Sequence, residues 1–295
     1  MIVLSLFDGM SCGQIALKEL GIIPEKYYAS EIKPHAIKVT KANFPNTIHI
    51  GDVRKVFYKD GVLETENGVF EVGKIDLLIG GSPCQDLSGM NKNQIGLAGD
   101  KSSLFWEYAR IKKETLPYFF MLENVGSMPY NDAMTITKEM GVNGIRIDSS
   151  LVSAQQRDRI YWTNIPGDGI SLFGGGQIEQ PKDKNIKLKD ILESGFVDRD
   201  KSLALLARHY VGCPVNEDKL KKYLLKRYKK SFLNVKWSDK SMNDESIEML
   251  TQIEMERLQT VPEGYTKCLT HREASNVLGD GWTIEVIKHI FKNIV

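Results

Sequence analysis

Short apolar segments alternate with helix-like segments along the first 165 or so residues, and this alternation constrains the fold more than any other feature. Ile2–Phe7 is typical of a strand, and Ser11–Leu20 follows with apolar side chains at helical spacing. Tyr27–Ile32 predicts a second strand, after which Pro34 suits the first position of a helix. Strands joined by helices pair in parallel. We therefore predict an α/β fold with a doubly wound, mainly parallel sheet.

The alternation continues after these elements, with a β-hairpin predicted to turn on Asn67-Gly68. The other predicted strands are Thr47–Ile50, Ile75–Ile79, Tyr118–Leu122, Ile145–Val152 and Arg159–Thr163, and the helices are Ser102–Thr115 and Asp132–Met140. Glycines then mark turns, and helical patterns return at Ile253–Leu258 and Thr283–Phe291. We expect residues 1–168 and 243–295 to form one domain, with residues 169–242 as a separate inserted region.

The inserted region is strongly basic, although the whole chain carries a net charge of only +1. Lys182–Lys240 contains 16 basic and 8 acidic residues, a net charge of +8, so the rest of the chain carries −7. Within it, Lys219–Lys230 has seven basic and no acidic residues and predicts an amphipathic helix with a cationic face. This asymmetry indicates contact with a polyanion. A solvated charged face is the alternative.

Cysteine usage and hydropathy narrow the class of protein. The four cysteines lie far apart without a Cys-x-x-Cys pair, which favours neither a zinc site nor disulfide bonds and fits a reducing cytoplasm. The apolar N-terminus is short and lacks a basic leader, so we expect a first strand and not a signal peptide. No segment approaches the roughly 20 apolar residues of a membrane span.

Cys84 follows the predicted strand Ile75–Ile79, in the sequence Gly80-Gly81-Ser82-Pro83-Cys84-Gln85. A thiol at the carboxyl end of a parallel strand lies where open α/β sheets place their chemistry. Cys84 is therefore either a nucleophile or a small buried apolar residue, and its position alone favours neither.

The segment Phe7-Asp8-Gly9-Met10-Ser11-Cys12-Gly13 follows the first strand and opens the first helix, as in a nucleotide-binding loop. Glu31 ends the second strand, 22 residues beyond Gly9, where a carboxylate can accept both ribose hydroxyl protons. Asp52 follows the third strand and could accept from an adenine amino group. Each acid alone is more typical of a helix cap or turn. Suitable groups at three successive strand ends favour a nucleotide-type site.

Glu123-Asn124-Val125 ends the fifth strand, and a carboxyl group there can protonate a ring that a neighbouring thiol attacks. The alternative is a glutamate at the protein surface. In Gln155–Arg159, the side chains of Arg157 and Arg159 point the same way if the segment is extended. Two guanidinium groups on one face could bind a base oxygen and a phosphate. The alternative is that each forms a structural ion pair with a carboxylate.

Four motifs together resemble those of the cytosine-C5 DNA methyltransferase family. They are Phe7-x-Gly9, Pro83-Cys84-Gln85, Glu123-Asn124-Val125 and Gln155-x-Arg157-x-Arg159. The resemblance covers most of residues 1–165 and 243–295, and the basic region lies where the family has its variable target-recognition region. Further matching motifs are Ser103-Leu104-Phe105 and Thr251-x-x-Glu254-x-x-Arg257-Leu258-Gln259-x-x-Pro262. Gly51-Asp52-Val53-Arg54, Val152-Ser153-Ala154 and Leu278-Gly279-Asp280-Gly281-Trp282 resemble the catalytic domains of animal de novo DNA methyltransferases.

Two residues depart from these patterns. Asp280 stands where many family members have Asn, which bears on the methyl-donor site, and Gln85 follows the cysteine as in the commoner bacterial form. The length of 295 residues, without chromatin-reading domains, favours a bacterial or phage origin.

The resemblance implies transfer of a methyl group from S-adenosyl-L-methionine to carbon 5 of cytosine in double-stranded DNA, with base flipping and no metal. It implies that Cys84 attacks carbon 6, Glu123 donates to ring nitrogen 3, Arg159 contacts the base oxygen, and Arg157 contacts the sugar-phosphate or the catalytic loop. The cofactor contacts that it implies are Phe7, Asp8, Gly9, Met10, Ser11, Cys12, Glu31, Ile32, Asp52, Val53, Arg54, Leu104, Asp280, Gly281 and Trp282. The expected DNA contacts are Ser82, Pro83, Gln85, Asn124, Gln155, Lys221, Lys222 and Arg227.

Two other functions stay open at this point. A transfer-RNA cytosine methyltransferase of the same family would share every catalytic residue, and the basic region favours DNA over it. A catalytically inactive relative that binds DNA or a partner enzyme is the second alternative, which the intact Cys84, Glu123 and arginine pair disfavour. A cognate restriction endonuclease is a further expected partner, whereas the sequence indicates neither the target site nor the oligomeric state.

Overall fold

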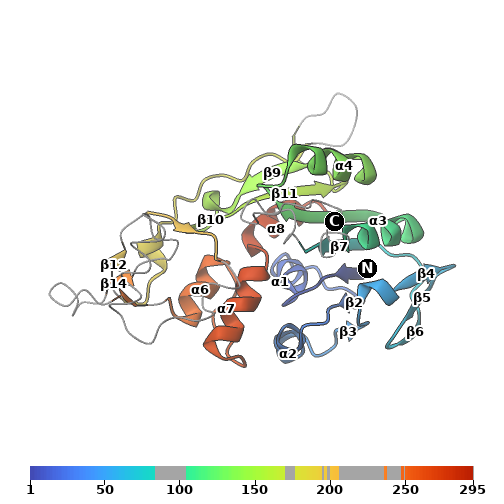
Figure 1. The fold of residues 1–295 in the computed structure, drawn as a ribbon, viewed down its shortest axis with the longest axis horizontal. Coiled ribbons are helices and arrows are strands. Elements are labelled where there is room, and N and C mark those ends of the chain that lie inside the picture. The colour runs from blue at the N-terminus through green and yellow to red at the C-terminus, as the bar shows by residue number, and fades with distance from the viewer. Residues whose placement is uncertain are drawn as a thin grey trace. The chain divides into compact units, whose positions relative to one another are not determined.

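The structure is a computed structural model in which the chain forms two compact units (Figure 1). It describes residues 1–83, 104–169, 177–194, 196–197, 200–205, 236–237, 247–248 and 250–294. Unit 1 comprises Met1–Ile147, Asp158–Pro181 and Val286–Val295, and unit 2 comprises Asp148–Arg157 and Lys182–Glu285. This division differs from the expected domains, because residues 148–157 and 243–285 group with unit 2 and residues 169–181 group with unit 1.

Unit 1 is built on a seven-stranded sheet in the order β3-β2-β1-β7-β8-β11-β9. The five strands from β3 to β8 in this order pair in parallel, and β11 pairs antiparallel with β8. The strands are β1 (Ile2–Leu6), β2 (Lys26–Ser30), β3 (Ile48–His49), β7 (Leu77–Gly81), β8 (Phe119–Val125), β9 (Ile145–Asp148) and β11 (Asp158–Thr163). The predicted α/β fold with a mainly parallel sheet is confirmed.

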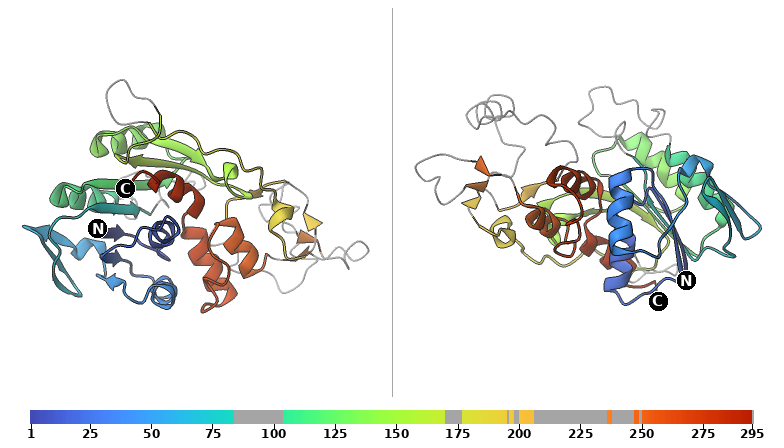
Figure 2. Two further views of the ribbon diagram at one scale, coloured as in Figure 1. Left: turned by 180° about the vertical axis from the view of Figure 1, so that it is seen from behind. Right: turned by 90° about the horizontal axis from the view of Figure 1, so that it is seen from below.

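Helices cover both faces of this sheet because its strands carry apolar side chains on both sides. Leu4, Leu78 and Leu122 are fully buried in one core with residues of α3 (Leu104–Thr115) and α4 (Tyr130–Met140). The remaining helices of this region are α1 (Cys12–Glu19) and α2 (Pro34–Asn43). In the right-hand view of Figure 2 these two blue helices lie on one side of the blue strands.

Close contact between α1 and the sheet depends on Gly13. A Cβ atom at this position would meet Cδ1 of Ile79 at 2.3 Å and the hydroxyl of Tyr27 at 2.9 Å. A side chain there would require Ile79 and Tyr27 to shift. Gly13 therefore allows α1 to pack closely against these two side chains of the sheet.

A small antiparallel sheet, β4-β5-β6, is inserted after β3. It consists of β4 (Phe57–Lys59), β5 (Val62–Thr65) and β6 (Gly68–Glu71). The predicted hairpin is confirmed, but its turn is wrong by one residue. Thr65 pairs with Gly68, so Glu66 and Asn67 form the loop and Gly68, with φ of 143°, already belongs to β6. β4 was not predicted.

The predicted strand Ile145–Val152 is too long. β9 ends at Asp148, whose carboxylate accepts from the backbone N–H of Ser150 at 2.8 Å and so begins a 3₁₀ turn, η3 (Ser149–Leu151). The short strand β10 (Gln155–Gln156) follows and pairs with β13 (Ser202–Leu203). The capping carboxylate competes with the strand for the backbone.

Unit 2 contains α6 (Gln252–Leu258), α7 (His271–Asp280), the 3₁₀ turn η4 (Leu188–Ile191) and a small sheet of β12 (Phe196–Val197), β14 (Lys236–Trp237) and β15 (Ile247–Glu248). α8 (Ile284–Phe291) begins in unit 2 and continues in unit 1. The helices predicted at Ile253–Leu258 and Thr283–Phe291 are confirmed, whereas α7 was missed. The predicted basic helix Lys219–Lys230 lies outside the described residues.

Both α6 and α7 begin with a capping box. Thr251 and Glu254 cap α6, and Thr270 and Glu273 cap α7, each threonine accepting from the backbone N–H of the glutamate three residues on. The Thr-x-x-Glu spacing before α7 was a usable signal for that helix. Among the described residues, no helix combines the length and apolar character required to cross a membrane.

Candidate functional site

The predicted site residues of unit 1 follow the carboxyl ends of neighbouring strands. Phe7 comes after β1, Glu31 after β2, and Ser82 after β7. In the sheet, β1 lies between β2 and β7, so the chain order reverses at β1. Open α/β sheets bind ligands outside the carboxyl ends of the strands at such a reversal.

The loop between β1 and α1 turns sharply. Phe7, Gly9 and Ser11 have positive φ angles of 57°, 58° and 61°. The backbone N–H of Gly9 donates to Glu31 Oε2 at 2.8 Å, which joins the first two strand ends. Glu31 Oε1 accepts from the backbone N–H groups of Ile32 and Lys33, each at 2.8 Å.

The backbone at Gly9 faces open space. A Cβ atom built there would find its nearest neighbour, the carbonyl oxygen of Phe7, at 4.0 Å. Backbone without a side chain, next to a carboxylate at the adjacent strand end, suits a ligand with a ribose and an extended polar chain. These residues therefore fit an adenosine-containing group.

Asp8 is a buried carboxyl group at the base of this loop. The hydroxyl of Tyr27 donates to its Oδ1 at 2.7 Å, and the hydroxyl of Ser11 donates to its Oδ2. Burial raises the pKa of Asp8 from 3.8 to about 6, although the hydrogen bonds from Ser11, Ser5 and Tyr27 oppose the shift. Sequence reasoning missed Tyr27, because nothing in a buried strand position identifies the partner of its hydroxyl.

The third acid, Asp52, is held by its own neighbours. It accepts from the backbone N–H of Arg54 at 3.0 Å, which caps η1 (Val53–Lys55), and both its oxygens accept from the Arg54 guanidinium. These bonds lower the pKa of Asp52. The backbone N–H of Asp52 donates to Glu66 of the β5–β6 loop at 2.7 Å. This geometry is the turn-capping alternative of the sequence analysis, and it leaves the adenine contact untested.

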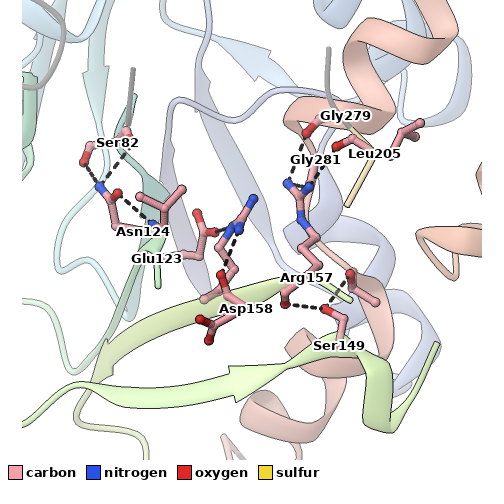
Figure 3. A network of polar contacts seen from close by, with 12 residues as sticks. Ser82, Glu123, Asn124, Ser149, Arg157, Asp158, Leu205, Gly279 and Gly281 are labelled. Carbon is pink, nitrogen blue, oxygen red and sulfur yellow. Dashed lines mark hydrogen bonds and ion pairs between the residues drawn. The ribbon is translucent and has the colours of Figure 1, made fainter. Parts of the chain in front are cut away.

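The ends of β7 and β8 are tied by one side chain. The amide of Asn124 donates to Ser82 Oγ at 3.1 Å and accepts from the backbone N–H of Val125 at 2.8 Å (Figure 3). Ser82 and Asn124 are 4% and 1% exposed. Both were expected to contact DNA, and this contact stays a prediction. In this structure they hold the strand end from which the chain leads to Cys84.

Glu123 and Arg159 form an ion pair on one face of the sheet. Nε of Arg159 lies 2.8 Å from Oε1 of Glu123, and the side chains are 13% and 10% exposed. In the antiparallel β8–β11 pair, Arg159 lies opposite Val125 and Tyr161 opposite Glu123, so the two charged residues are diagonal neighbours. Figure 3 shows the Glu123 carboxylate facing a guanidinium group.

Arg157 belongs to unit 2 and contacts a different set of groups. Its guanidinium donates to the carbonyl oxygens of Leu205 at 3.1 Å, Gly279 at 3.1 Å and Gly281 at 2.8 Å (Figure 3). Arg157 is only 4% exposed. The guanidinium is thus buried against backbone carbonyls, and the expected contact of Arg157 with the sugar-phosphate or the catalytic loop stays a prediction.

Gln155 is fully buried as well. Its amide nitrogen donates to the carbonyl oxygen of Leu258 at 2.7 Å and to Oε1 of Gln259 at 3.0 Å, and its oxygen accepts from the backbone N–H of Leu205 at 3.2 Å. In this structure the Gln155 side chain is part of the frame of unit 2, and its expected contact with DNA stays a prediction.

The predicted cofactor residues near the C-terminus also lie in unit 2. Asp280 is the last residue of α7 and is exposed, and Gly281 caps the helix by donating its N–H to Val277 at 2.9 Å. Trp282 is 8% exposed.

The remaining predicted cofactor residues belong to unit 1. Met10, Cys12 and Val53 are buried, Leu104 and Phe7 are half-buried, and Ile32 and Arg54 are exposed. Pro83, expected to contact DNA, is half-buried. Cys84, Gln85, Lys221, Lys222 and Arg227 lie outside the described residues. Among the described residues, no group of three or more His, Cys, Asp or Glu side chains could hold a metal ion.

Comparison with known proteins identifies the family. A family model described as "C-5 cytosine-specific DNA methylase" matches residues 1–295. The type II methyltransferase M1.ScrFI of Lactococcus lactis subsp. cremoris is 30% identical over 207 residues, which cover 67% of this chain and 50% of that protein. The orphan methyltransferase M.SPRI of Bacillus phage SPR is 31% identical over 205 residues, covering 65% and 42%. The chain thus spans about half the length of the curated relatives that it matches.

Solved structures confirm the fold. The Dnmt2 methyltransferase of S. pombe superposes with a TM-score of 0.62 at 14% identity, covering 100% of this chain and 98% of that one. The methyltransferase EhMeth of Entamoeba histolytica gives a TM-score of 0.66 at 14% identity, covering 100% and 97%.

Proposed function

Because the chain belongs to the C-5 cytosine-specific DNA methylase family, we propose that it transfers a methyl group to carbon 5 of cytosine in double-stranded DNA. The observation that carries this proposal is the Glu123–Arg159 pair at the end of β8. β8 pairs directly with β7, where Gly81 lies opposite Glu123, and β7 leads to Cys84 three residues later. Glu123 thus lies near the carboxyl end of β8, and in the sequence Cys84 follows the end of the adjacent strand β7.

In the proposed reaction, the thiolate of Cys84 adds to carbon 6 of the cytosine ring while Glu123 donates a proton to ring nitrogen 3. The addition turns carbon 5 into an enamine-type nucleophile. After carbon 5 has been methylated, a water molecule accepts its proton, the bond between sulfur and carbon 6 breaks, and Cys84 leaves as a thiolate. Ring nitrogen 3 returns its proton to Glu123. The Nε of Arg159 orients the Glu123 carboxyl group. Arg159 also lies beside the carboxyl end of β8, and there we propose that it contacts the base oxygen.

In unit 1, the loop Phe7–Ser11 and Glu31 are the groups that we propose to hold the cofactor. For Asp280–Trp282 the cofactor contact expected from the sequence also stays a proposal. Glu31 suits the ribose hydroxyls, and the open backbone at Gly9 suits the part of the ligand beyond the ribose. S-adenosyl-L-methionine, when bound, supplies the methyl group. Asp8 acts through Ser11 and Tyr27 by fixing the loop and has no proposed contact with the reacting atoms.

We propose DNA as the substrate because the basic region Lys182–Lys240 supplies charge for phosphate contacts. The target base has to leave the duplex, since carbon 6 is inaccessible within the base stack. We further propose that the protein acts in the cytoplasm of a bacterium or of a phage-infected host. A restriction endonuclease with the same target sequence is a proposed partner, in line with the type II relatives.

Covalent trapping tests the proposal. A duplex with 5-fluorocytosine at the target position cannot release its fluorine as a cation, so the Cys84 adduct should persist and migrate slowly in a denaturing gel. The target position is first found by mapping methylated cytosines in DNA from cells that express the chain. We expect the adduct with the wild type and S-adenosyl-L-methionine, and none with Cys84→Ser.

Three controls separate the alternatives. Cys268→Ser removes another cysteine and should leave trapping intact. The same assay with 5-fluorocytosine transfer RNA distinguishes a transfer-RNA enzyme, which would trap RNA and not DNA. Wild-type protein that binds DNA but traps neither substrate would identify the chain as a catalytically inactive relative and refute the proposal.

A further inference from the structure

The buried guanidinium of Arg157 joins two segments that are far apart in the sequence. It donates hydrogen bonds to the carbonyl oxygen of Leu205, 48 residues later in the sequence, and to those of Gly279 and Gly281, more than 120 residues later. All four residues belong to unit 2. The carbonyl groups of Gly279 and Gly281 enclose Asp280 in the sequence, so one planar fork fixes the backbone on both sides of this residue.

The backbone of Arg157 is itself held in place. Its N–H donates to Asp148 Oδ1 at 3.1 Å, and its carbonyl oxygen accepts from the Ser149 hydroxyl at 3.2 Å. The same hydroxyl proton is shared with Thr283 Oγ1, which lies 2.9 Å from Ser149 Oγ, and the Thr283 hydroxyl donates to Gln259 Oε1 at 3.0 Å. The guanidinium therefore fixes the turn Gly279–Gly281 from one side, and the Ser149–Thr283 contact fixes the residue that follows Trp282.

The bonds of Arg157 contribute strongly because they are buried. A hydrogen bond from a charged donor is stronger than a neutral one, and a carbonyl left without its donor in the interior is costly. Lysine cannot reproduce this arrangement, because Arg157 donates from two separate nitrogens in one plane, Nη1 to Leu205 and Nη2 to Gly279 and Gly281, whereas lysine has a single nitrogen. A change at Arg157 should therefore displace the turn at the end of α7.

We propose that Arg157 is a positioning residue for the methyl donor, which holds the turn Asp280–Trp282 in the conformation that binds the cofactor. This inference rests on the proposed function, because Asp280–Trp282 is assigned to the cofactor there. Arg157 contacts neither the cofactor nor the DNA in this proposal. It acts through the carbonyl groups of Gly279 and Gly281.

Arg157→Lys tests the proposal with full-length protein, and Lys201→Met is the matched control. Lys201 is also a cation that donates to three carbonyl oxygens of unit 2, those of Ser150 at 2.6 Å, Ser153 at 2.9 Å and Ile186 at 2.6 Å. None of these acceptors belongs to the turn. The measurement is the Kd of S-adenosylhomocysteine by isothermal titration calorimetry, with the Tm of each variant.

We expect Arg157→Lys to raise the Kd of S-adenosylhomocysteine at least tenfold, whereas Lys201→Met lowers the Tm by a similar amount and changes the Kd less than threefold. In steady-state assays, Arg157→Lys should raise the KM for S-adenosyl-L-methionine more than it lowers kcat. Equal Tm losses with an unchanged Kd in Arg157→Lys would show a purely structural role and overturn the proposal.

Two further measurements keep the test decisive. If Arg157→Lys does not fold, Ser149→Ala leaves the guanidinium intact and removes only the hydroxyl between Arg157 and Thr283. It should raise the Kd a few-fold, and no rise at all would contradict the proposal. Wild-type protein that binds no S-adenosylhomocysteine would instead refute the cofactor assignment, and so the proposed function.

Discussion

The Glu123–Arg159 pair depends on the register of two strands that run in opposite directions. Arg159 reaches Glu123 diagonally across the β8–β11 ladder, from the position opposite Val125. Because side chains alternate between the faces of a strand, a slip of one residue in β11 would move Arg159 to the other face of the sheet. The chemistry of the pair is therefore set by backbone hydrogen bonds outside the pair itself.

A prediction at the residue scale concerns Asp8. Its pKa is raised to about 6 in the folded chain against 3.8 for an ordinary Asp, so between these values the folded state binds more protons than the unfolded state. Stability should therefore fall as pH rises through this window, by up to about 3 kcal/mol. Asp8→Asn, which carries no charge, should lose this dependence and gain stability relative to the wild type above pH 6.

Urea unfolding between pH 4 and pH 8 measures this difference. Asp60→Asn is the control, because Asp60 lies in an exposed turn. A stability difference between wild type and Asp8→Asn that stays constant across the range would refute the assigned pKa.

The contacts of individual residues could be predicted where a short sequence motif determines them. The spacing from Gly9 to Glu31 indicated a nucleotide-type site at the ends of β1 and β2, and in the structure a hydrogen bond joins these two residues. Arg157 could not be placed in this way, because its partners lie 48 to 124 residues away and are backbone carbonyls, which every residue possesses. Cys84 lies outside the described residues, so its role stays a prediction.

At the scale of elements, α7 begins at a capping box that is visible in the sequence and ends at the turn proposed to bind the cofactor. The Thr270–Glu273 capping box begins the helix, and Gly279–Gly281 lies at its other end. Sequence reasoning found the strands of unit 1 because their apolar runs are buried on both faces. It missed β4 because the strand has only three residues, too few to show a period.

Thr270→Ala should destabilise the protein by about 1 kcal/mol, because the N-terminal N–H groups of α7 lose an acceptor. Thr270→Ser keeps the hydroxyl and should stay within a few tenths of a kcal/mol of the wild type. Chemical denaturation of both variants measures the effect. A Thr270→Ala variant as stable as Thr270→Ser would show that the cap contributes nothing.

At the scale of the whole molecule, the uneven charge should appear in the salt dependence of DNA binding. Each phosphate contact adds about 0.9 to the slope of log affinity against log salt concentration. The triple variant Lys221→Gln, Lys222→Gln, Arg227→Gln should lower this slope by up to about 3 and weaken binding to all sequences alike. Fluorescence anisotropy over a range of salt concentrations measures it.

The control removes three exposed charges from unit 1, in Lys26→Gln, Lys59→Gln, Lys74→Gln. If the control lowers the slope as much as the triple variant, the basic region is not the main phosphate contact.

The basic region could be predicted from amino-acid composition. The boundary of unit 2 could not be predicted, because residues 243–285 group with this unit through tertiary contacts.

The discontinuity of unit 1 has a consequence for how the protein is made. Val286, Ile287, Ile290 and Phe291 of α8 are buried at 1% exposure or less, and Lys288 pairs with Glu19 of α1 at 2.9 Å. These residues leave the ribosome only after all of unit 2 has been synthesised. Until then the nascent chain lacks part of the core of unit 1, and the surface that α8 will cover is exposed to chaperones and to neighbouring nascent chains.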